Sequence, residues 1–155
     1  MSTDQLMRKA LAALGDLDGP LSIEVINDLV RLDEFDDPLT VAEAAEALDV
    51  SPHTLRYYER IGLVQVPRDA AGNRTYDADA MRRIVFLTRM RLSGMAIRDL
   101  QTYVALVDRG EETVPERLDM LLEHRDTIRR QIAELTLSLA ATEYKIATYG
   151  GRTQP

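Results

Sequence analysis

The chain has 155 residues, no cysteine and a formal net charge of −7 at pH 7. This length allows one modest core, which an obligate dimer would enlarge, and the lack of cysteine excludes disulfides, thiolate metal sites and thiol-based sensing. The sequence contains neither an apolar run long enough to span a bilayer nor a recognisable signal peptide, so we expect a cytoplasmic protein with no membrane partner.

The negative charge is distributed unevenly along the chain. Residues 1–37 carry 9 acidic and 3 basic residues, residues 38–92 carry 7 and 8, and residues 93–155 carry 10 and 8. All eight basic residues of the middle segment are arginine, which pairs bidentately with phosphate or guanine. The middle segment therefore suits a nucleic acid partner in spite of the negative total.

Capping signals place two short helices in the middle segment. The hydroxyl of Thr40 and the carboxylate of Glu43 fit a capping box, which predicts a helix over residues 41–48. Ser51 is a favoured N-cap and is followed by proline, so a second helix is expected over residues 52–62. Two helices joined by so short a turn have helix-turn-helix spacing.

The second helix carries a cationic stripe opposite an apolar one when its residues are placed at 100° intervals. Leu55 and Tyr58 lie on the apolar side, with Ile61 at its margin. Such a helix suits the major groove of DNA, with its apolar back packed on the first helix; the alternative is a solvated surface of arginine and tyrosine. The polar stripe consists of His53, Arg56, Tyr57 and Arg60.

Residues 63–76 are typical of a two-stranded hairpin with arginine at both flanks, as in the wing of a DNA-binding domain. Gly72 and Asn73 are expected to supply the positive φ angles of its tight turn. An ordinary β-ribbon with surface arginines is the alternative. The side chains expected to reach phosphates beside the groove are Arg68, Arg74 and, through its hydroxyl, Tyr76.

Two further helices follow the hairpin. Asp77 is the expected N-cap of a helix over residues 78–92, and a Ser-Gly break separates it from a helix over residues 96–109. Near the start of the first, Arg82 and Arg83 either contact phosphate or form a solvated face. The stripes expected to be buried are Met81, Ile84, Val85 and Leu92 in the first helix and Ile97, Leu100, Val104 and Val107 in the second.

A second capping box, Thr113 with Glu116, predicts a long helix over residues 115–149. Its apolar residues recur at alternating spacings of three and four, which is typical of a coiled-coil seam, and only Arg125 and Thr142 interrupt them. A helix this long has too little domain to pack on, so we expect it to pair with its copy in a second chain. The seam residues are Leu118, Leu121, Ile128, Ile132, Leu135, Leu139, Ile146 and Tyr149.

The stretch SPHTLRYYERIGLV, followed by PRDAAGNRTY, resembles the DNA-binding segment of the MerR family of bacterial transcription regulators. The similarity covers residues 40–149 and is nearest to the branch with aldehyde-responsive regulators, although this chain lacks cysteine. The resemblance implies an antiparallel coiled coil, and a dimer that bends and untwists an overlong promoter spacer so that RNA polymerase can engage it. Asn73 is a departure, because many relatives carry an aromatic or other bulky residue there.

The helix face, the hairpin and the resemblance together define one candidate DNA-binding surface. The resemblance implies that the second helix meets the groove and backbone, and that the hairpin makes the wing contact. The candidate DNA-binding residues are Ser51, His53, Thr54, Arg56, Tyr57, Arg60, Arg68, Gly72, Asn73, Arg74 and Tyr76.

The sequence thus predicts a mainly α protein with a winged helix-turn-helix DNA-binding domain over residues 38–109 and a dimerisation helix over residues 113–149. A flexible tail follows over residues 150–155. We expect a homodimeric transcription regulator on an inverted-repeat promoter operator; the alternative is an architectural DNA-binding protein or protein-interaction adaptor. No enzyme activity, catalytic residue, cofactor or metal is predicted, and the sequence leaves the operator, the small-molecule effector and the sign of regulation open.

Residues 1–37 are expected to form an acidic helical hairpin. Two hypotheses remain for this extension: an additional packing layer on the protein, or a regulatory segment that competes with phosphate for the arginines or docks another protein. Its two apolar stripes are Leu6, Met7, Ala10, Leu11 and Leu14, then Ile23, Ile26, Leu29 and Val30.

Overall fold

A computed structural model describes residues 37–151 of the chain. The predicted acidic hairpin lies outside the described residues except for Asp37, as does most of the predicted tail. The chain forms two compact units that divide between Gln101 and Thr102. Among the described residues, no helix is both long and apolar enough to cross a membrane.

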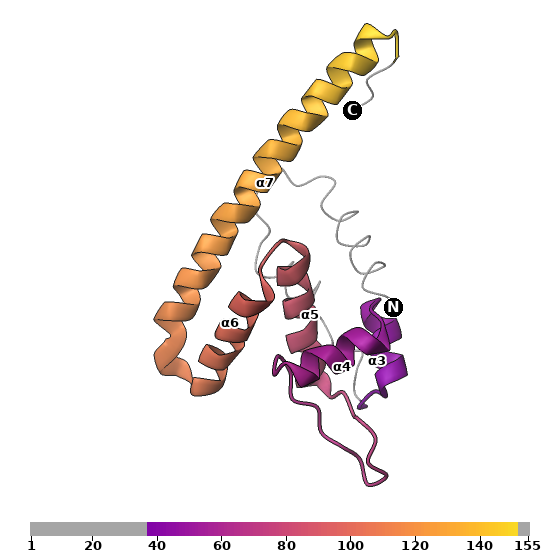
Figure 1. Ribbon diagram of the computed structural model, residues 1–155, viewed down its shortest axis with the longest axis vertical. Helices are drawn as coiled ribbons and strands as arrows, with labels where there is room; N and C mark the ends of the chain where they lie inside the picture. Colours follow the sequence, from indigo (N-terminus) through magenta and orange to yellow (C-terminus); the bar gives the residue numbers. More distant parts are fainter. Residues whose placement is uncertain (1–36, 152–155) are drawn as a thin grey trace. The chain divides into compact units, whose positions relative to one another are not determined.

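The first unit contains α3 (Val41–Leu48), α4 (Pro52–Arg60), α5 (Ala78–Leu92) and the start of α6 (Ile97–Arg109) (Figure 1). α3 packs against α4, as the helix-turn-helix spacing predicts. Three of the predicted caps are present, because side-chain oxygens accept a backbone N–H at the start of each helix. These caps are Thr40 for α3, Ser51 for α4 and Asp77 for α5.

Helix α4 ends two residues earlier than predicted. Ile61 is its C-cap, and Gly62 adopts a φ of 81°, so that the Leu63 amide turns back to the Tyr58 carbonyl at 2.9 Å. Glycine permits this left-handed angle without a Cβ clash. The turn buries Leu63 fully and directs the chain into the segment before α5.

The core of the first unit differs from the predicted stripe of α5 at two residues. Met81 and Ile84 are buried as predicted, but Val85 is only half-buried and Leu92 is 73% exposed. The chain turns at Gly94, where φ is 103°, and Met95 is buried in its place. The largest fully buried apolar side chains of this unit are Leu55, Leu63, Tyr76, Met81, Ile84, Leu87 and Leu100.

The segment between α4 and α5 extends away from the helices in Figure 1 as a loop, rather than as the predicted two-stranded hairpin. We call residues 67–76 the wing. Its two sides meet at a single antiparallel bridge, Arg68 with Arg74, and Leu39 forms a second bridge with Tyr76. Each bridge consists of one residue pair, so the two sides of the wing form no continuous ladder.

The tip of the wing is closed by one carboxylate. Asp69 Oδ1 accepts the backbone N–H groups of Ala71 and Asn73, both at 2.9 Å, and the Asp69 carbonyl accepts the Gly72 N–H at 3.0 Å. Gly72 has the predicted positive φ, 82°, whereas Asn73 does not have a positive φ, contrary to expectation. The second left-handed residue is unnecessary because the Asp69 side chain holds the turn.

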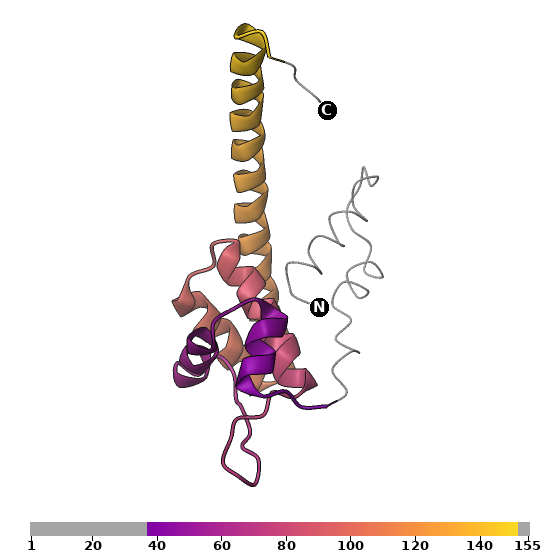
Figure 2. The ribbon, with the colours of Figure 1, turned by 90° about the vertical axis from the view of Figure 1, so that its right-hand side faces the viewer.

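The second unit contains the rest of α6, the short 3₁₀ helix η1 (Glu111–Thr113) and α7 (Val114–Thr148), which Figure 2 shows as one continuous helix. With 35 residues, α7 is roughly 50 Å long. The second predicted capping box is absent. The Thr113 hydroxyl lies instead 2.6 Å from the Leu106 carbonyl and 2.7 Å from the Gly110 carbonyl, because η1 turns it back toward α6.

Candidate nucleic-acid interface

Helix α4 presents the polar face that its sequence predicts. His53, Arg56 and Arg60 are exposed, whereas Leu55 and Tyr58 on the opposite side are buried. Thr54 and Tyr57 are half-buried between the two faces. The apolar side therefore holds α4 in the first unit, and the cationic side remains available to a ligand.

The start of α4 is fixed by two hydroxyl side chains. Ser51 Oγ accepts the Thr54 backbone N–H at 3.1 Å and lies 2.9 Å from Thr54 Oγ1. Ser51 thus caps α4 as its sequence predicts, and this structural role accounts for its side chain without a contact to DNA. Farther along, the Arg60 guanidinium lies 5.5 Å from the centre of the Tyr57 ring, a cation–π distance.

The wing is attached to α4 through a residue that the sequence analysis missed. Glu59, in the last turn of α4, divides its carboxylate between two arginines: Oε2 accepts Arg74 Nε–H, and Oε1 lies 3.5 Å from Arg68 Nη2. We call these three residues the Glu59 clamp. The hydrogen bond to Glu59 raises the pKa of Arg74 above its ordinary value. The only sequence signal was an acidic residue beside a cationic stripe. Its partners in the wing are distant in sequence, and only the folded structure identifies them.

Tyr76 requires a correction, because its side chain does not reach the surface. The residue is fully buried, and its hydroxyl has no hydrogen-bond partner among the described residues. Burial, and after it the Glu59 carboxylate, raise the pKa of Tyr76, so the hydroxyl is neutral at physiological pH. The bridge to Leu39 turns this ring into the core, and only Arg68 and Arg74 of the three predicted phosphate ligands are accessible.

Comparisons with known proteins match the same segments. A family model described as MerR HTH family regulatory protein matches residues 39–106, and one described as MerR, DNA binding matches residues 81–141. An uncharacterised HTH-type transcriptional regulator of Haemophilus influenzae is 34% identical over 111 residues, which cover 71% of this chain and 82% of the relative. The chain belongs to the MerR family of transcription regulators.

Two further comparisons match this MerR family protein with a named relative and with a solved structure. The HTH-type transcriptional regulator AdhR of Bacillus subtilis is 35% identical over 91 residues, covering 58% of this chain and 65% of AdhR. Among solved structures, HiNmlR, a MerR family regulator lacking the sensor domain and bound to promoter DNA, matches with 33% identity and a TM-score of 0.69. That match covers 74% of this chain and 91% of HiNmlR.

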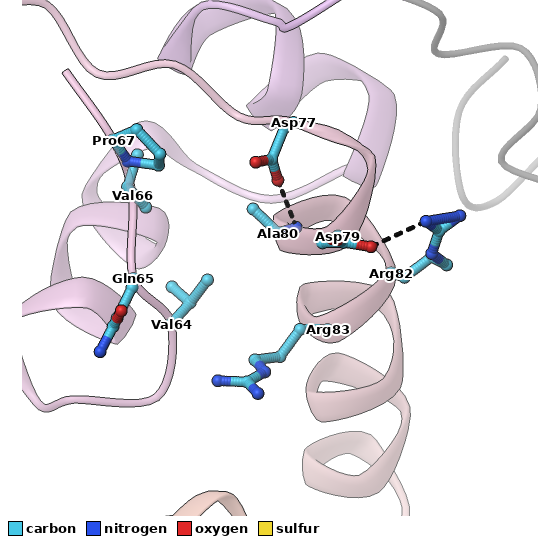
Figure 3. Close-up of a pocket in the computed structure, with 9 residues that line it drawn as sticks. All are labelled: Val64, Gln65, Val66, Pro67, Asp77, Asp79, Ala80, Arg82 and Arg83. Atoms are coloured by element: carbon cyan, nitrogen blue, oxygen red, sulfur yellow. Dashed lines mark hydrogen bonds and ion pairs between the residues drawn. The ribbon is translucent and has the colours of Figure 1, made fainter. Parts of the chain in front are cut away.

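A groove lies beside the base of the wing in this MerR family protein (Figure 3). It has a volume of about 660 Å³ and is formed by residues 64–67 and by the first turns of α5. Asp77 is occupied by the cap to the Ala80 N–H, and Asp79 pairs with Arg82 at 2.8 Å. The Arg83 side chain extends across the groove toward the segment before the wing. Arg82 and Arg83 therefore differ: Arg82 pairs with Asp79 on its own helix, and Arg83 points into the groove.

The seam of α7 is largely uncovered in the single chain. Leu135 is 70% exposed, Ile132 59% and Leu139 58%, whereas Leu121 and Ile128, nearer the start of the helix, are half-buried. A contiguous apolar stripe on the surface of one chain marks an interaction site. Within residues 37–151, no group of three or more His, Asp or Glu side chains is placed to hold a metal ion.

Proposed function

We propose that this MerR family protein is a homodimeric regulator that binds an inverted-repeat promoter operator through α4 and the wing. The observation that carries the proposal is the combination of an exposed cationic face on α4 with wing arginines attached to the same helix. A helix with such a face reads base edges in the major groove, while flanking arginines contact phosphates.

Each side chain has a distinct part in this proposal. Arg56 and His53 meet base edges or phosphates in the groove, and Arg60, stacked on Tyr57, meets the adjoining backbone. Arg68 and Arg74 contact phosphates beside the groove. Ser51 and Thr54 shape the start of α4, and Gly72 and Asn73 shape the wing tip. Tyr76 supports the base of the wing from the core and does not contact DNA.

Dimerisation through α7 is supported by the exposed seam. Pairing two copies of the helix covers Leu118, Leu121, Ile128, Ile132, Leu135, Leu139 and Ile146 and presents two DNA-binding units to one operator. An inverted repeat is the sequence that a two-fold symmetric dimer matches, because each half-site then meets the same residues. The antiparallel arrangement rests on membership in the family.

We further infer that the dimer acts on transcription by distorting the spacer of its promoter for RNA polymerase in the cytoplasm. Family membership supports this, together with the likeness to HiNmlR, which is bound to promoter DNA. The competing function is an architectural DNA-binding protein, which would bend DNA without altering initiation.

One experiment separates these functions. Duplexes selected by the wild-type protein from a random library are placed in promoters with spacers of ordinary and extended length, and transcription is measured with purified RNA polymerase. We expect selection of an inverted repeat and a change in transcript level that depends on spacer length. Selection of no sequence contradicts operator binding, and bending with constant transcription at every spacer length identifies an architectural role.

A further inference from the structure

Glu59 is an acidic side chain beside the cationic face of α4. A carboxylate next to DNA repels phosphate, so its presence lowers affinity unless another effect outweighs the repulsion. Its side chain is 22% exposed, which leaves it only partly screened by solvent. Both of its oxygens contact wing arginines. Holding these arginines in place is the effect that can outweigh the repulsion.

The clamp holds both sides of the wing at once. Arg68 and Arg74 are bridged to each other through their backbones, and each side chain also reaches Glu59. The hydrogen bonds within the wing, such as the Thr75 N–H to the Pro67 carbonyl at 2.9 Å and the Asp69 N–H to the Asn73 carbonyl at 2.8 Å, join parts of the wing to one another and not to α4. The base of the wing is held by the buried Tyr76 and its bridge to Leu39, and the clamp adds a direct side-chain link between the wing and α4.

The clamp also orients Arg74. Its Nε–H is bound to Glu59, so the plane of the guanidinium is fixed while the Nη side remains for another acceptor. The Arg74 side chain is 27% exposed, so part of it is accessible to an anion. Ordering a long side chain before DNA arrives removes part of the entropy lost on binding.

Resting on the DNA-binding function proposed above, we propose that Glu59 is a positioning residue for operator recognition. It fixes the wing and the Arg74 guanidinium relative to α4 before DNA binds. On an operator, α4 and the wing must contact DNA at the same time, and the fixed arrangement of the two raises affinity. On arbitrary DNA, where phosphate charge dominates, the extra carboxylate lowers affinity. Glu59 therefore increases the ratio of specific to non-specific binding.

The binding test uses Glu59→Ala and Glu59→Gln with two probes: a duplex that the wild-type protein selects from a random library, and a scrambled duplex of equal composition. Glu59→Ala should lower affinity for the selected duplex about three- to tenfold, the cost of ordering one long side chain on binding. Its affinity for the scrambled duplex should be equal or higher. Glu59→Gln should lie between alanine and wild type, because its amide oxygen still accepts Arg74 Nε–H.

Glu46→Ala is the matched control, because it removes an exposed carboxylate from α3 in the same unit. It should change the affinities for both duplexes by the same factor. If Glu59→Ala behaves in that way, or tightens binding to both duplexes equally, the carboxylate only repels DNA and the positioning role is wrong.

A DNA-free measurement tests the clamp independently of the proposed function. Amide hydrogen exchange at Thr75 should be faster in Glu59→Ala than in the wild-type protein and intermediate in Glu59→Gln, with exchange at Ile84 in the core of α5 unchanged. Unchanged exchange at Thr75 overturns the proposal even if DNA binding is normal. Should the wild-type protein select no duplex, operator binding fails, and the exchange measurement still decides whether Glu59 holds the wing.

Discussion

Ser51 Oγ accepts the backbone N–H of Thr54 at 3.1 Å, and this contact determines where α4 begins. Because Ser51 serves as a cap, its contribution to stability can be separated from any contact with DNA. Ser51→Ala should lower the free energy of unfolding by about 1 kcal/mol, a typical loss for an N-cap oxygen. Urea denaturation followed by circular dichroism measures this.

Ser51→Asp is the companion variant. Aspartate caps a helix as well as serine does, so stability should be retained. A carboxylate at the start of α4 repels phosphate, however, so DNA affinity should fall. If Ser51→Asp binds DNA as the wild-type protein does, the start of α4 does not approach the backbone.

Arg56 is expected to supply base or phosphate contacts from the exposed face of α4. Arg56→Ala should weaken binding to the selected duplex by about 1–3 kcal/mol, with the dimer intact. Fluorescence anisotropy titrations measure this. Arg129→Ala, which removes an equal charge from an exposed position on α7, is the control and should change affinity much less. Equal losses for the two variants would mean that net charge, rather than the α4 face, controls binding.

The dimer interface is tested on α7 itself. Leu135→Asp combined with Leu139→Asp should produce monomers, because each unpaired carboxylate buried in the seam costs about 3 kcal/mol. Light scattering during gel filtration reports the mass. Leu137→Asp combined with Tyr144→Asp is the matched control: both residues are more than 70% exposed but lie outside the seam, so this variant should remain dimeric. A dimeric seam variant would place the interface elsewhere.

Tyr76→Phe removes a buried hydroxyl that has no partner among residues 37–151. Since an unsatisfied buried polar group costs about 1–3 kcal/mol, the variant should be as stable as the wild-type protein or more stable. DNA affinity should stay within about twofold, well below the tenfold that corresponds to 1.4 kcal/mol. Tyr57→Phe, the same deletion at a half-buried residue of α4, is the comparison. A loss of affinity in Tyr76→Phe but not in Tyr57→Phe would mean that the Tyr76 hydroxyl contacts DNA.

The features that sequence predicted well are those decided within a few residues. Thr40, Ser51 and Asp77 cap the helices they were expected to cap, since an N-cap bond spans only two or three residues. The apolar side of α4 followed from helical periodicity alone.

The errors concern contacts between residues distant in sequence or conformations set by a neighbouring turn. Tyr76 is buried because it is bridged to Leu39. Thr113 does not cap α7, because it is the last residue of η1 and its hydroxyl is directed to the Leu106 carbonyl of α6. Glu59 accepts a hydrogen bond from Arg74, which lies fifteen residues farther along the chain. Helical and strand periodicities carry no information about such pairings.

The wing tip has a consequence for how this protein can evolve. The Asp69 carboxylate and carbonyl close the turn by accepting backbone N–H groups, while Ala70 and Ala71 are exposed. Substitutions at these two alanines therefore alter the chemistry of the tip at little cost to folding. On the proposed DNA-binding function, lysine, arginine or an aromatic ring acquired there would change the flanking DNA that the protein prefers, while the side chains of α4 stay the same. Ala70 and Ala71 are accordingly the positions to randomise first when new operator preferences are sought by selection.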